Sequence, residues 1–172
     1  NDVALTTVAG GLGRYLRRRE VILDDVDFRV MIPVNTRASG SGAGPGNQVA
    51  SLLARLPIEE RDPVRQLRRV SETTASLKAS HQVRGVKLIE DVADWTDTAV
   101  ITGMVRLAMR RRTGNLVVTN VPGPSFPLYL RGAPVLECYP LVPLMGNQAL
   151  GIALFSYAGA LHWGFNADRY TV

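Results

Sequence analysis

Cysteine and histidine are scarce in this chain, which contains only Cys138, His81 and His162. A single cysteine excludes an internal disulfide framework and suits a reducing compartment. The two histidines lie far apart, with no cysteine or carboxylate at ligand spacing, so the sequence carries no metal-binding pattern. We expect Cys138 to be a small buried apolar residue of a strand, His162 to have a structural role, and His81 to be exposed.

Several signatures of membrane proteins and enzymes are also missing. No apolar run reaches the roughly 18 residues of a membrane-spanning helix, and no secretory signal is visible. The sequence contains no Gly-x-Ser-x-Gly elbow, phosphate loop or dinucleotide fingerprint. It therefore carries no self-sufficient catalytic centre. Because the chain does not begin with Met and opens directly into a helix pattern, we expect it to be the C-terminal part of a longer protein.

Charge of either sign is rare in the last third of the chain. Residues 113–172 hold only two basic and two acidic side chains, so they are predicted to form buried sheet. Residues 61–112 hold 11 Lys and Arg against 6 Asp and Glu, a surplus that equals the net charge of +5. The arginine runs at 17–19 and 110–112 are typical of helix ends that face water. The alternative is binding to nucleic acid, anionic lipid or cofactor phosphates, and an aromatic content of 6% disfavours nucleic acid.

Hydrophobic periodicity predicts a chain of alternating helices and strands. The expected helices cover residues 1–19, a segment that starts at Asp62-Pro63, residues 86–95 and residues 97–112. The expected strands cover residues 28–34, 47–56, 134–142, 148–157 and 161–167. A turn at Ala158-Gly159 joins the last two strands into a β-hairpin, and residues 38–46 are predicted to be a flexible loop.

Both of the first two predicted helices have an apolar face and a capping residue. In the first, Leu5, Val8, Leu12 and Leu16 recur at helical spacing behind an N-cap at Asn1. Its three glycines, at positions 10, 11 and 13, weaken the helix and suggest close packing against another backbone. In the second, Asp62 is the cap, and the inner stripe consists of Val64, Leu67, Val70, Thr74 and Leu77.

The most constrained segment covers residues 116–127. It starts as an apolar, β-branched strand from Leu116 to Val118. A rigid turn is predicted to follow, because three prolines fix φ and remove amide donors while Gly123 permits a backbone angle that other residues resist. A buried strand that runs into a stiff, uncharged corner can hold one side of a cavity.

A set of segments covering nearly the whole chain is specific in combination, although each one is weak alone. The segments are Asn1-Asp2-Val3 before a glycine-interrupted helix, residues 29–37 (Arg-Val-Met-Ile-Pro-Val-Asn-Thr-Arg), Gly46-Asn47-Gln48, residues 115–124 with Asn120-Val121-Pro122, residues 139–143 (Tyr-Pro-Leu-Val-Pro), residues 147–152 (Asn-Gln-Ala-Leu-Gly-Ile) and Asn166-Ala167-Asp168-Arg169. Together they resemble the C-terminal half of the bacterial wax ester synthase/diacylglycerol acyltransferase family.

The resemblance implies an α/β fold, a two-layer sandwich with a mixed β-sheet. Residues 1–172 would be the C-terminal lobe of a two-lobed, chloramphenicol acetyltransferase-like (condensation-domain-like) enzyme. Enzymes of this family transfer a fatty acyl group from acyl-CoA to diacylglycerol, giving triacylglycerol, or to a long-chain alcohol, giving a wax ester. In that fold the reaction occurs in a tunnel between the N-terminal and C-terminal lobes.

The catalytic motif of the family, His-His-x-x-x-Asp-Gly, is absent from this sequence. Its second histidine is the general base for the acceptor hydroxyl, a role that suits an imidazole that is neutral near pH 7. The resemblance therefore implies an N-terminal lobe that carries this motif, either preceding Asn1 in the intact protein or present as a separate chain. No catalytic residue is assigned to this chain, which we expect to be inactive alone.

Six residues are matched to the family's non-catalytic motifs by the resemblance. Asn1 and Asp2 match its Asn-Asp motif, and Asn120, Val121 and Pro122, followed by Gly123, match its Asn-Val-Pro motif. Their implied role is to shape the tunnel and support the catalytic lobe. Helix capping would explain Asn1 and Asp2 equally well, and a turn at the end of a strand would explain residues 120–122.

The expected partners are the N-terminal lobe, acyl-CoA as co-substrate, and diacylglycerol or a fatty alcohol, with no bound cofactor or metal and no nucleic acid. The implied location is cytoplasmic, at the surface of the inner membrane or of lipid droplets. Two alternatives stay open. One is a condensation-type acyltransferase that acts on carrier-protein thioesters, and the other is a non-catalytic module that binds lipid or a membrane surface.

Overall fold

The computed structural model describes residues 1–35, 49–79, 114–144 and 148–171. The contacts divide the chain into two compact units, Asn1–Thr113 and Gly114–Val172. Several predicted features lie outside the described residues: the loop at 38–46, the helices over 86–95 and 97–112, His81, and the arginine run at 110–112.

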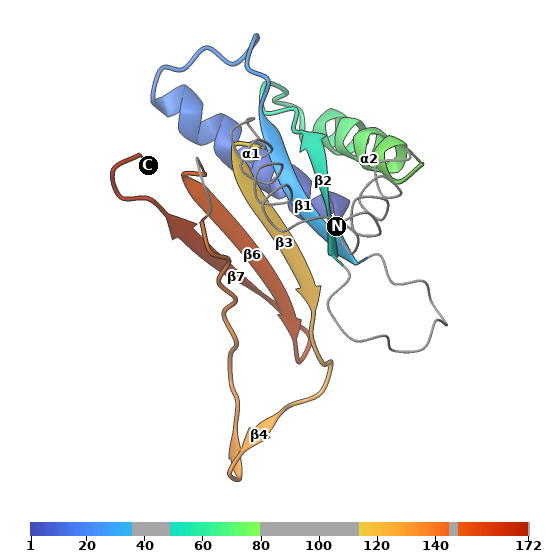
Figure 1. Cartoon of the computed structure of the whole chain (residues 1–172), viewed down its shortest axis with the longest axis vertical. Helices are drawn as coiled ribbons and strands as arrows, with labels where there is room; N and C mark the ends of the chain where they lie inside the picture. The colour runs from blue at the N-terminus through green and yellow to red at the C-terminus, as the bar shows by residue number, and fades with distance from the viewer. Residues whose placement is uncertain (36–48, 80–113, 145–147, 172) are drawn as a thin grey trace, which may run out of the picture. The chain divides into compact units, whose positions relative to one another are not determined.

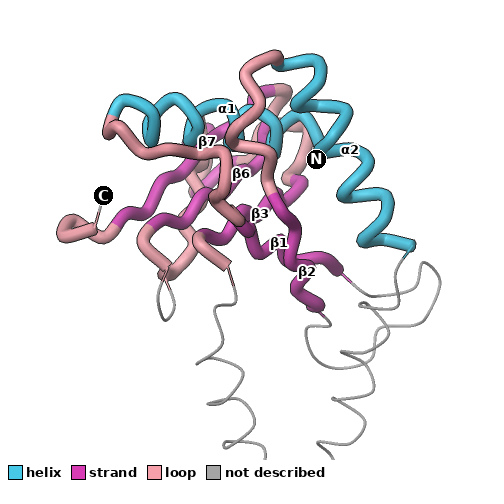
Figure 2. Tube along the Cα trace, turned by 90° about the horizontal axis from the view of Figure 1, so that it is seen from above, coloured by secondary structure: helices cyan, strands magenta, loops and turns pink. Residues whose placement is uncertain are grey.

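The first unit contains two helices and an antiparallel pair of strands (Figure 1). Its elements are α1 (Asp2–Arg18), β1 (Arg29–Asn35), β2 (Val49–Arg55) and α2 (Pro63–Ala79), which confirms the predicted order. β1 and β2 pair in a regular register, with Arg29 opposite Arg55. α2 packs against both β2 and α1, and Figure 2 shows the two helices on one side of the two strands, as a two-layer arrangement requires.

The predicted apolar face of α1 is confirmed, and its glycines differ from one another. Leu5 and Val8 are buried. A β-carbon at Gly13 would overlap the carbonyl oxygen of Ile58, so the helix approaches the turn after β2 more closely than any other residue permits. Gly11 has nothing within 4 Å of the same position, so close packing explains Gly13 and not Gly11.

The start of α2 is fixed by the predicted cap. The Asp62 carboxylate accepts hydrogen bonds from the amides of Val64, at 3.0 Å, and Arg65, at 2.8 Å. Both bonds hold the pKa of Asp62 below its ordinary value, and the bond from the Arg65 amide has the larger effect. The predicted inner stripe is confirmed at Val70 and Thr74 and wrong at Val64, which is 58% exposed. Gln66 is buried instead, because its amide nitrogen donates to the carbonyl oxygens of Pro57 and Glu60.

The second unit contains β3 (Leu116–Pro122), β4 (Tyr129–Leu130), β5 (Ala133–Pro134), β6 (Leu150–Tyr157) and β7 (Ala160–Ala167). β3 pairs parallel to β6 and β6 pairs antiparallel to β7, so the predicted mixed sheet is confirmed. Ala158 and Gly159 have φ of 47° and 83°, the left-handed angles of a two-residue hairpin turn, so the predicted hairpin is confirmed as well.

Two predictions for the last third of the chain are wrong. Residues 134–142 do not form a strand, because only Ala133–Pro134 pair, with Tyr129–Leu130. The sheet is buried at β3 and β6, but residues 121–141 expose many large apolar side chains. None of the described helices is both long enough and apolar enough to cross a membrane.

Candidate functional site

The end of β3 carries four of the six predicted site residues. Asn120 lies opposite Leu154 of β6, and the strand continues through Pro122. The predicted turn therefore starts too early. Pro122 is the last residue of the strand, so the amide donor that proline lacks is missing only at the end of the ladder. Burial falls along β3 from Leu116, which is 1% exposed, to Val121, which is 46% exposed, so the strand leaves the core before it ends.

Gly123 is required for space, not for an unusual backbone angle. It lies outside the left-handed region of φ, so the predicted reason for this glycine is wrong. A β-carbon here would overlap the carbonyl oxygen of Ser156 and the ring of Phe155, both in β6. The Gly123 amide donates to the Ser156 hydroxyl at 3.1 Å. The corner after β3 is thus held against the end of β6 by contact and by a hydrogen bond.

Tyr157, the last residue of β6, closes the base of the loop that carries β4 and β5. Its hydroxyl accepts a hydrogen bond from the Leu128 amide and donates one to the Val135 carbonyl, both at 2.8 Å. The Val135 amide donates in turn to the Leu128 carbonyl at 2.9 Å. The tyrosine is only 2% exposed, so these bonds are protected from water. The loop therefore leaves the sheet from a fixed base.

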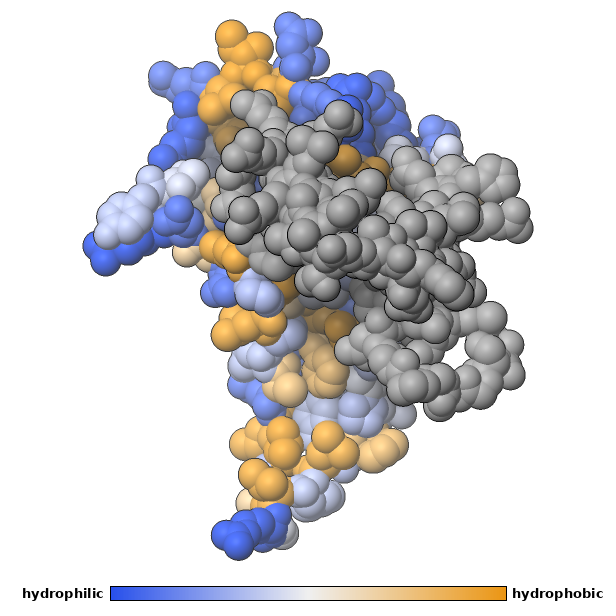
Figure 3. All heavy atoms as spheres, in the orientation of Figure 1, coloured by the Kyte–Doolittle hydropathy of each residue, from blue (hydrophilic) through white to orange (hydrophobic). Residues whose placement is uncertain are grey.

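Beyond that base, the β4–β5 hairpin exposes apolar side chains, and Figure 3 shows hydrophobic residues where Figure 1 places this hairpin. The large apolar side chains exposed between the end of β3 and the start of β6 are Val121, Phe126, Leu128, Tyr129, Leu130, Leu136, Tyr139 and Leu141. Leu130 and Leu136 are 72% and 80% exposed. A group of apolar side chains of this extent, exposed to solvent, marks a surface that contacts a partner or a ligand.

The segment after β5 lies across one face of β6 and β7. A β-carbon at Gly164 would overlap the carbonyl oxygen of Pro140, and one at Gly151 would lie 2.8 Å from Cγ1 of Val142. The Asn166 side-chain amide donates to the Val142 carbonyl at 3.0 Å. Residues 135–144, which we name the strap, therefore cover the sheet without joining its ladder.

His162 is buried under the strap among aromatic rings. It is 9% exposed, and the Tyr139 ring meets it edge-on at 5.3 Å between centroids. Nε2 of His162 is buried with no hydrogen-bond partner among the described residues. The packing agrees with the structural role predicted for this histidine. Cys138 is exposed, so its predicted burial is wrong. The hydroxyl of Tyr139 donates a hydrogen bond to the Glu137 carboxylate, and this bond raises the pKa of Tyr139.

Asn1 and Asp2 lie at the start of α1, in the first unit. Asn1 is the N-cap residue, and its carbonyl oxygen accepts the Leu5 amide at 3.0 Å. The Asp2 carboxylate accepts a hydrogen bond from the hydroxyl of Thr74, near the end of α2, at 3.2 Å. Asp2 thus ties α1 to α2 as well as placing negative charge in the first turn of its helix. The contact with Thr74 gives Asp2 an architectural role, whereas the Asn1 side chain makes no capping hydrogen bond, so the predicted capping explains the position of Asn1 only through its backbone.

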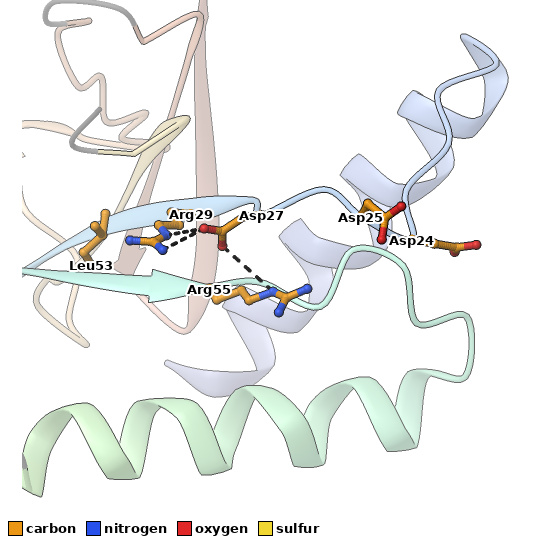
Figure 4. Close-up of a pocket in the computed structure, with 6 residues that line it drawn as sticks. All are labelled: Asp24, Asp25, Asp27, Arg29, Leu53 and Arg55. Carbon is orange, nitrogen blue, oxygen red and sulfur yellow. Dashed lines mark hydrogen bonds and ion pairs between the residues drawn. The ribbon is translucent and has the colours of Figure 1, made fainter. Parts of the chain in front are cut away.

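A polar depression lies at the start of β1 and the end of β2 (Figure 4). The Asp27 carboxylate in it contacts Nη2 of Arg29 at 2.7 Å and Nε of Arg55 at 4.0 Å. Hydrogen bonding to Arg29 holds the pKa of Asp27 below its ordinary value and raises that of Arg29. Asp24, Asp25 and Leu53 complete the lining. The central carboxylate is bonded to arginine, so Asp27 itself is not free to act as a general base.

The described residues hold no group of three or more His, Cys, Asp or Glu side chains that could bind a metal ion. The geometry offers an apolar corner and hairpin, a buried histidine held by packing, and helix termini fixed by hydrogen bonds. Sequence reasoning missed Tyr157 and Ser156, whose partners lie 29 and 33 residues away. The glycine inside β7 was a usable signal, because glycine within a strand often marks a close approach of backbone.

A family model described as the WS/DGAT C-terminal domain matches residues 45–172. The chain is 37% identical over its whole length to a putative diacylglycerol O-acyltransferase of Mycobacterium tuberculosis H37Rv, of which it covers 35%. It is 30% identical over 98% of its length to the O-acyltransferase WSD of Acinetobacter baylyi, of which it covers 36%. The chain thus spans about a third of the length of these relatives.

Two solved structures share the fold. The wax ester synthase/diacylglycerol acyltransferase of Marinobacter aquaeolei VT8 superposes with a TM-score of 0.70 and 27% identity, over 99% of this chain and 37% of that one. The first condensation domain of the CDA synthetase gives a TM-score of 0.52 at 18% identity, over 98% of this chain and 34% of that one. The second likeness is one of fold alone, and it agrees with the predicted chloramphenicol acetyltransferase-like architecture.

Proposed function

Because the chain belongs to the wax ester synthase/diacylglycerol acyltransferase family, as its C-terminal domain, we propose that the intact protein is an O-acyltransferase. It transfers a fatty acyl group from acyl-CoA to the hydroxyl group of diacylglycerol, of a long-chain alcohol, or of both. The observation that carries the proposal is the match over the whole chain to a relative named as a diacylglycerol O-acyltransferase.

The chemistry falls to a lobe outside this chain. The described histidine, His162, is packed between rings and cannot reach a substrate hydroxyl without leaving them. A histidine of the N-terminal lobe acts as general base and takes the proton of the acceptor hydroxyl. The oxygen then attacks the thioester carbonyl, the ester bond forms, and CoA leaves as its thiol with that proton. The chain described here shapes the site and supplies no reacting group.

The corner after β3 is our candidate for one wall of the substrate tunnel. Val121 and Pro122 are exposed at the end of the strand, and Gly123 holds the backbone against β6. The region is almost free of charge, which suits contact with an acyl chain. Asn120 lies next to these residues in the strand and is the polar group of the wall. Asn1 and Asp2 support the lobe through α1.

The exposed β4–β5 hairpin supports a contact with the N-terminal lobe. The hydrogen bonds of the Tyr157 hydroxyl fix the two ends of the loop that carries these apolar side chains, so the entropy lost by ordering the loop on contact is small. A chain that spans a third of its relatives is expected to expose surface that the remaining two thirds cover. We further place the protein at the surface of the inner membrane or of lipid droplets, where its lipid substrates reside.

Acyl transfer from radiolabelled palmitoyl-CoA tests the proposal. The full-length protein is incubated with dioleoylglycerol or hexadecanol, and labelled triacylglycerol or wax ester is separated by thin-layer chromatography. We expect product from the full-length protein and none from residues 1–172 alone. A full-length protein that yields no ester with either acceptor would refute the proposed function. Activity of residues 1–172 alone would refute the placement of the general base outside this chain.

A further inference from the structure

The helices of the first unit bring two basic segments together. Gly10 of α1 lies against the side chain of Gln66, near the start of α2. Further along α1, the Arg17 guanidinium donates to the Ile58 carbonyl at 3.3 Å, just before α2 begins. The two helices therefore run in opposite directions, and the arginine-rich end of α1 adjoins the arginine-rich start of α2.

Exposed charge around this contact is almost entirely basic. Within residues 14–20 and 59–69, seven arginines are exposed, and Glu20 is the one exposed acid. Arg69 is paired with Glu59, and Nε of Arg65 lies 3.9 Å from an oxygen of Glu60, which leaves five arginines. We name these five the arginine surface: Arg14, Arg18, Arg19, Arg61 and Arg68.

The other acidic groups of these segments are occupied by local contacts. An oxygen of Glu59 lies 2.9 Å from Nη1 of Arg69. The Glu60 carboxylate accepts the amides of Arg61 and Asp62, at 2.9 and 3.0 Å, and the Asp62 bond holds its pKa below the ordinary value. Both glutamate side chains are only 18% exposed. Both are turned inward, so most of the charge presented to solvent is positive.

Apolar side chains are interspersed with these arginines. Ile22 and Val21, which follow α1, are 80% and 40% exposed, and Val64 in the first turn of α2 is 58% exposed. Arg19 lies over the ring of Tyr15 at 5.1 Å. Figure 3 shows hydrophobic residues beside hydrophilic ones where Figure 1 places the connection from α1 to β1. Guanidinium groups bind lipid phosphates while apolar side chains enter the headgroup region, which is how surface-lying protein segments bind membranes.

We propose that the arginine surface docks the protein on an anionic lipid bilayer, with Ile22 and Val64 entering the headgroup layer. The exposed acids of this region are Glu20, Asp24 and Asp25, and the five arginines outnumber them by two, so the surface keeps a positive net charge. This inference rests on the proposed function, because it gives an enzyme of lipid acceptors a surface that holds it against the membrane that contains them.

Vesicle binding by the full-length protein tests the docking surface. The probes are vesicles of phosphatidylcholine with and without phosphatidylglycerol, and the protein bound is measured by co-sedimentation. We expect binding that requires the anionic lipid and weakens as NaCl is raised.

The double variant Arg14→Gln/Arg68→Gln should lower the partition coefficient at least about tenfold. These two arginines form no ion pair with described residues. Arg131→Gln/Arg169→Gln removes two exposed charges from the second unit and should change it by less than about twofold.

Equal binding by wild type and Arg14→Gln/Arg68→Gln, or an equal loss in the control variant, would overturn the inference. So would a wild type that binds phosphatidylcholine alone as well as it binds anionic vesicles. A second readout is acyl transfer to a detergent-dispersed acceptor, where the docking variant should keep the wild-type kcat and the wild-type KM for acyl-CoA. A raised KM would assign these arginines to CoA phosphates and overturn the docking surface. If the wild type binds anionic vesicles as expected but forms no ester, the proposed function fails and the docking surface stands.

Discussion

The carbonyl oxygen of Pro140 lies against the α-carbon of Gly164 in β7, where a β-carbon would overlap it. The strap can cover the sheet at this point only because the strand has no side chain there. The same face carries Gly151 in β6, below the side chain of Val142. Two glycines thus make room on the sheet for a segment that does not join its ladder.

Gly164→Ala should lower the free energy of unfolding by about 1–3 kcal/mol, because the obstructing atom is a backbone oxygen that cannot rotate away. Gly151→Ala is the matched control. The nearest atom there is a side-chain carbon, Cγ1 of Val142, at 2.8 Å, and the nearest backbone atom is the Val142 carbonyl oxygen, at 3.2 Å, so the overlap is milder and we expect a cost below about 1.5 kcal/mol. Urea denaturation of the two variants measures both values. A Gly164→Ala protein as stable as wild type would show that the strap is not fixed on β7.

Gly11→Ala and Gly13→Ala should change stability in opposite directions. Gly11 is exposed within α1 with nothing near its missing β-carbon, so alanine should stabilise the protein by about 0.5–1 kcal/mol. At Gly13 the Ile58 carbonyl occupies that space, and we expect a loss of about 1–3 kcal/mol. Thermal unfolding followed by circular dichroism gives the two signs. A rise in Tm for both variants would contradict the close approach of α1 to the turn after β2.

The sequence predicts elements best where one local pattern suffices. The apolar spacing of Leu5 and Val8, the cap at Asp62 and the left-handed pair Ala158-Gly159 each encode an element that the structure contains. The strap is the opposite case. Residues 134–142 have the apolar composition of a strand, but their position depends on glycines that follow later in the chain. No local pattern carries that information.

The candidate site shows the same division. The segment from Asn120 to Gly123 is predicted to end a strand, and it does, although the strand continues to Pro122. The sequence predicts that Gly123 is needed for its backbone angle, and this prediction is wrong. A side chain is excluded here by the ring of Phe155 and the carbonyl of Ser156, which become neighbours of Gly123 only because β3 pairs parallel to β6. Local propensity describes backbone angles and gives no account of such space.

Acid should weaken the cap of α2. Because amide hydrogen bonds from Arg65 and Val64 lower the pKa of Asp62 from its ordinary 3.8, the folded state favours the carboxylate. Its contribution to stability is therefore present above pH 3.8 and is lost as the pH falls through the lower folded pKa. In Asp62→Asn the side-chain oxygen still caps the helix but does not titrate. We expect wild type to exceed Asp62→Asn in Tm near neutral pH, with the gap closing on acidification.

The comparison with Asp62→Asn separates this group from other acids. Glu60 and Asp168 also have lowered pKa values, so wild type loses stability in acid through several carboxylates at once. Both proteins share those groups, and the difference in Tm isolates position 62. Asp62→Ala, which loses the cap itself, should have a lower Tm than Asp62→Asn at every pH. A gap that stays constant from neutral pH to below pH 3.8 would contradict the assignment.

Tyr157→Phe should open the base of the β4–β5 hairpin. The hydroxyl is buried and bonds both the Leu128 amide and the Val135 carbonyl, so its removal leaves two backbone groups short of a partner. We expect a loss of about 1–3 kcal/mol and faster hydrogen exchange at the Leu128 amide. Tyr170→Phe is the control, because Tyr170 is 87% exposed and phenylalanine keeps the ring on which Arg169 lies. Unchanged exchange in Tyr157→Phe would show that the hairpin is fixed by contacts other than this hydroxyl.

Because the hairpin is our candidate contact with the N-terminal lobe, the same variant should lower ester formation by the full-length protein while Tyr170→Phe does not.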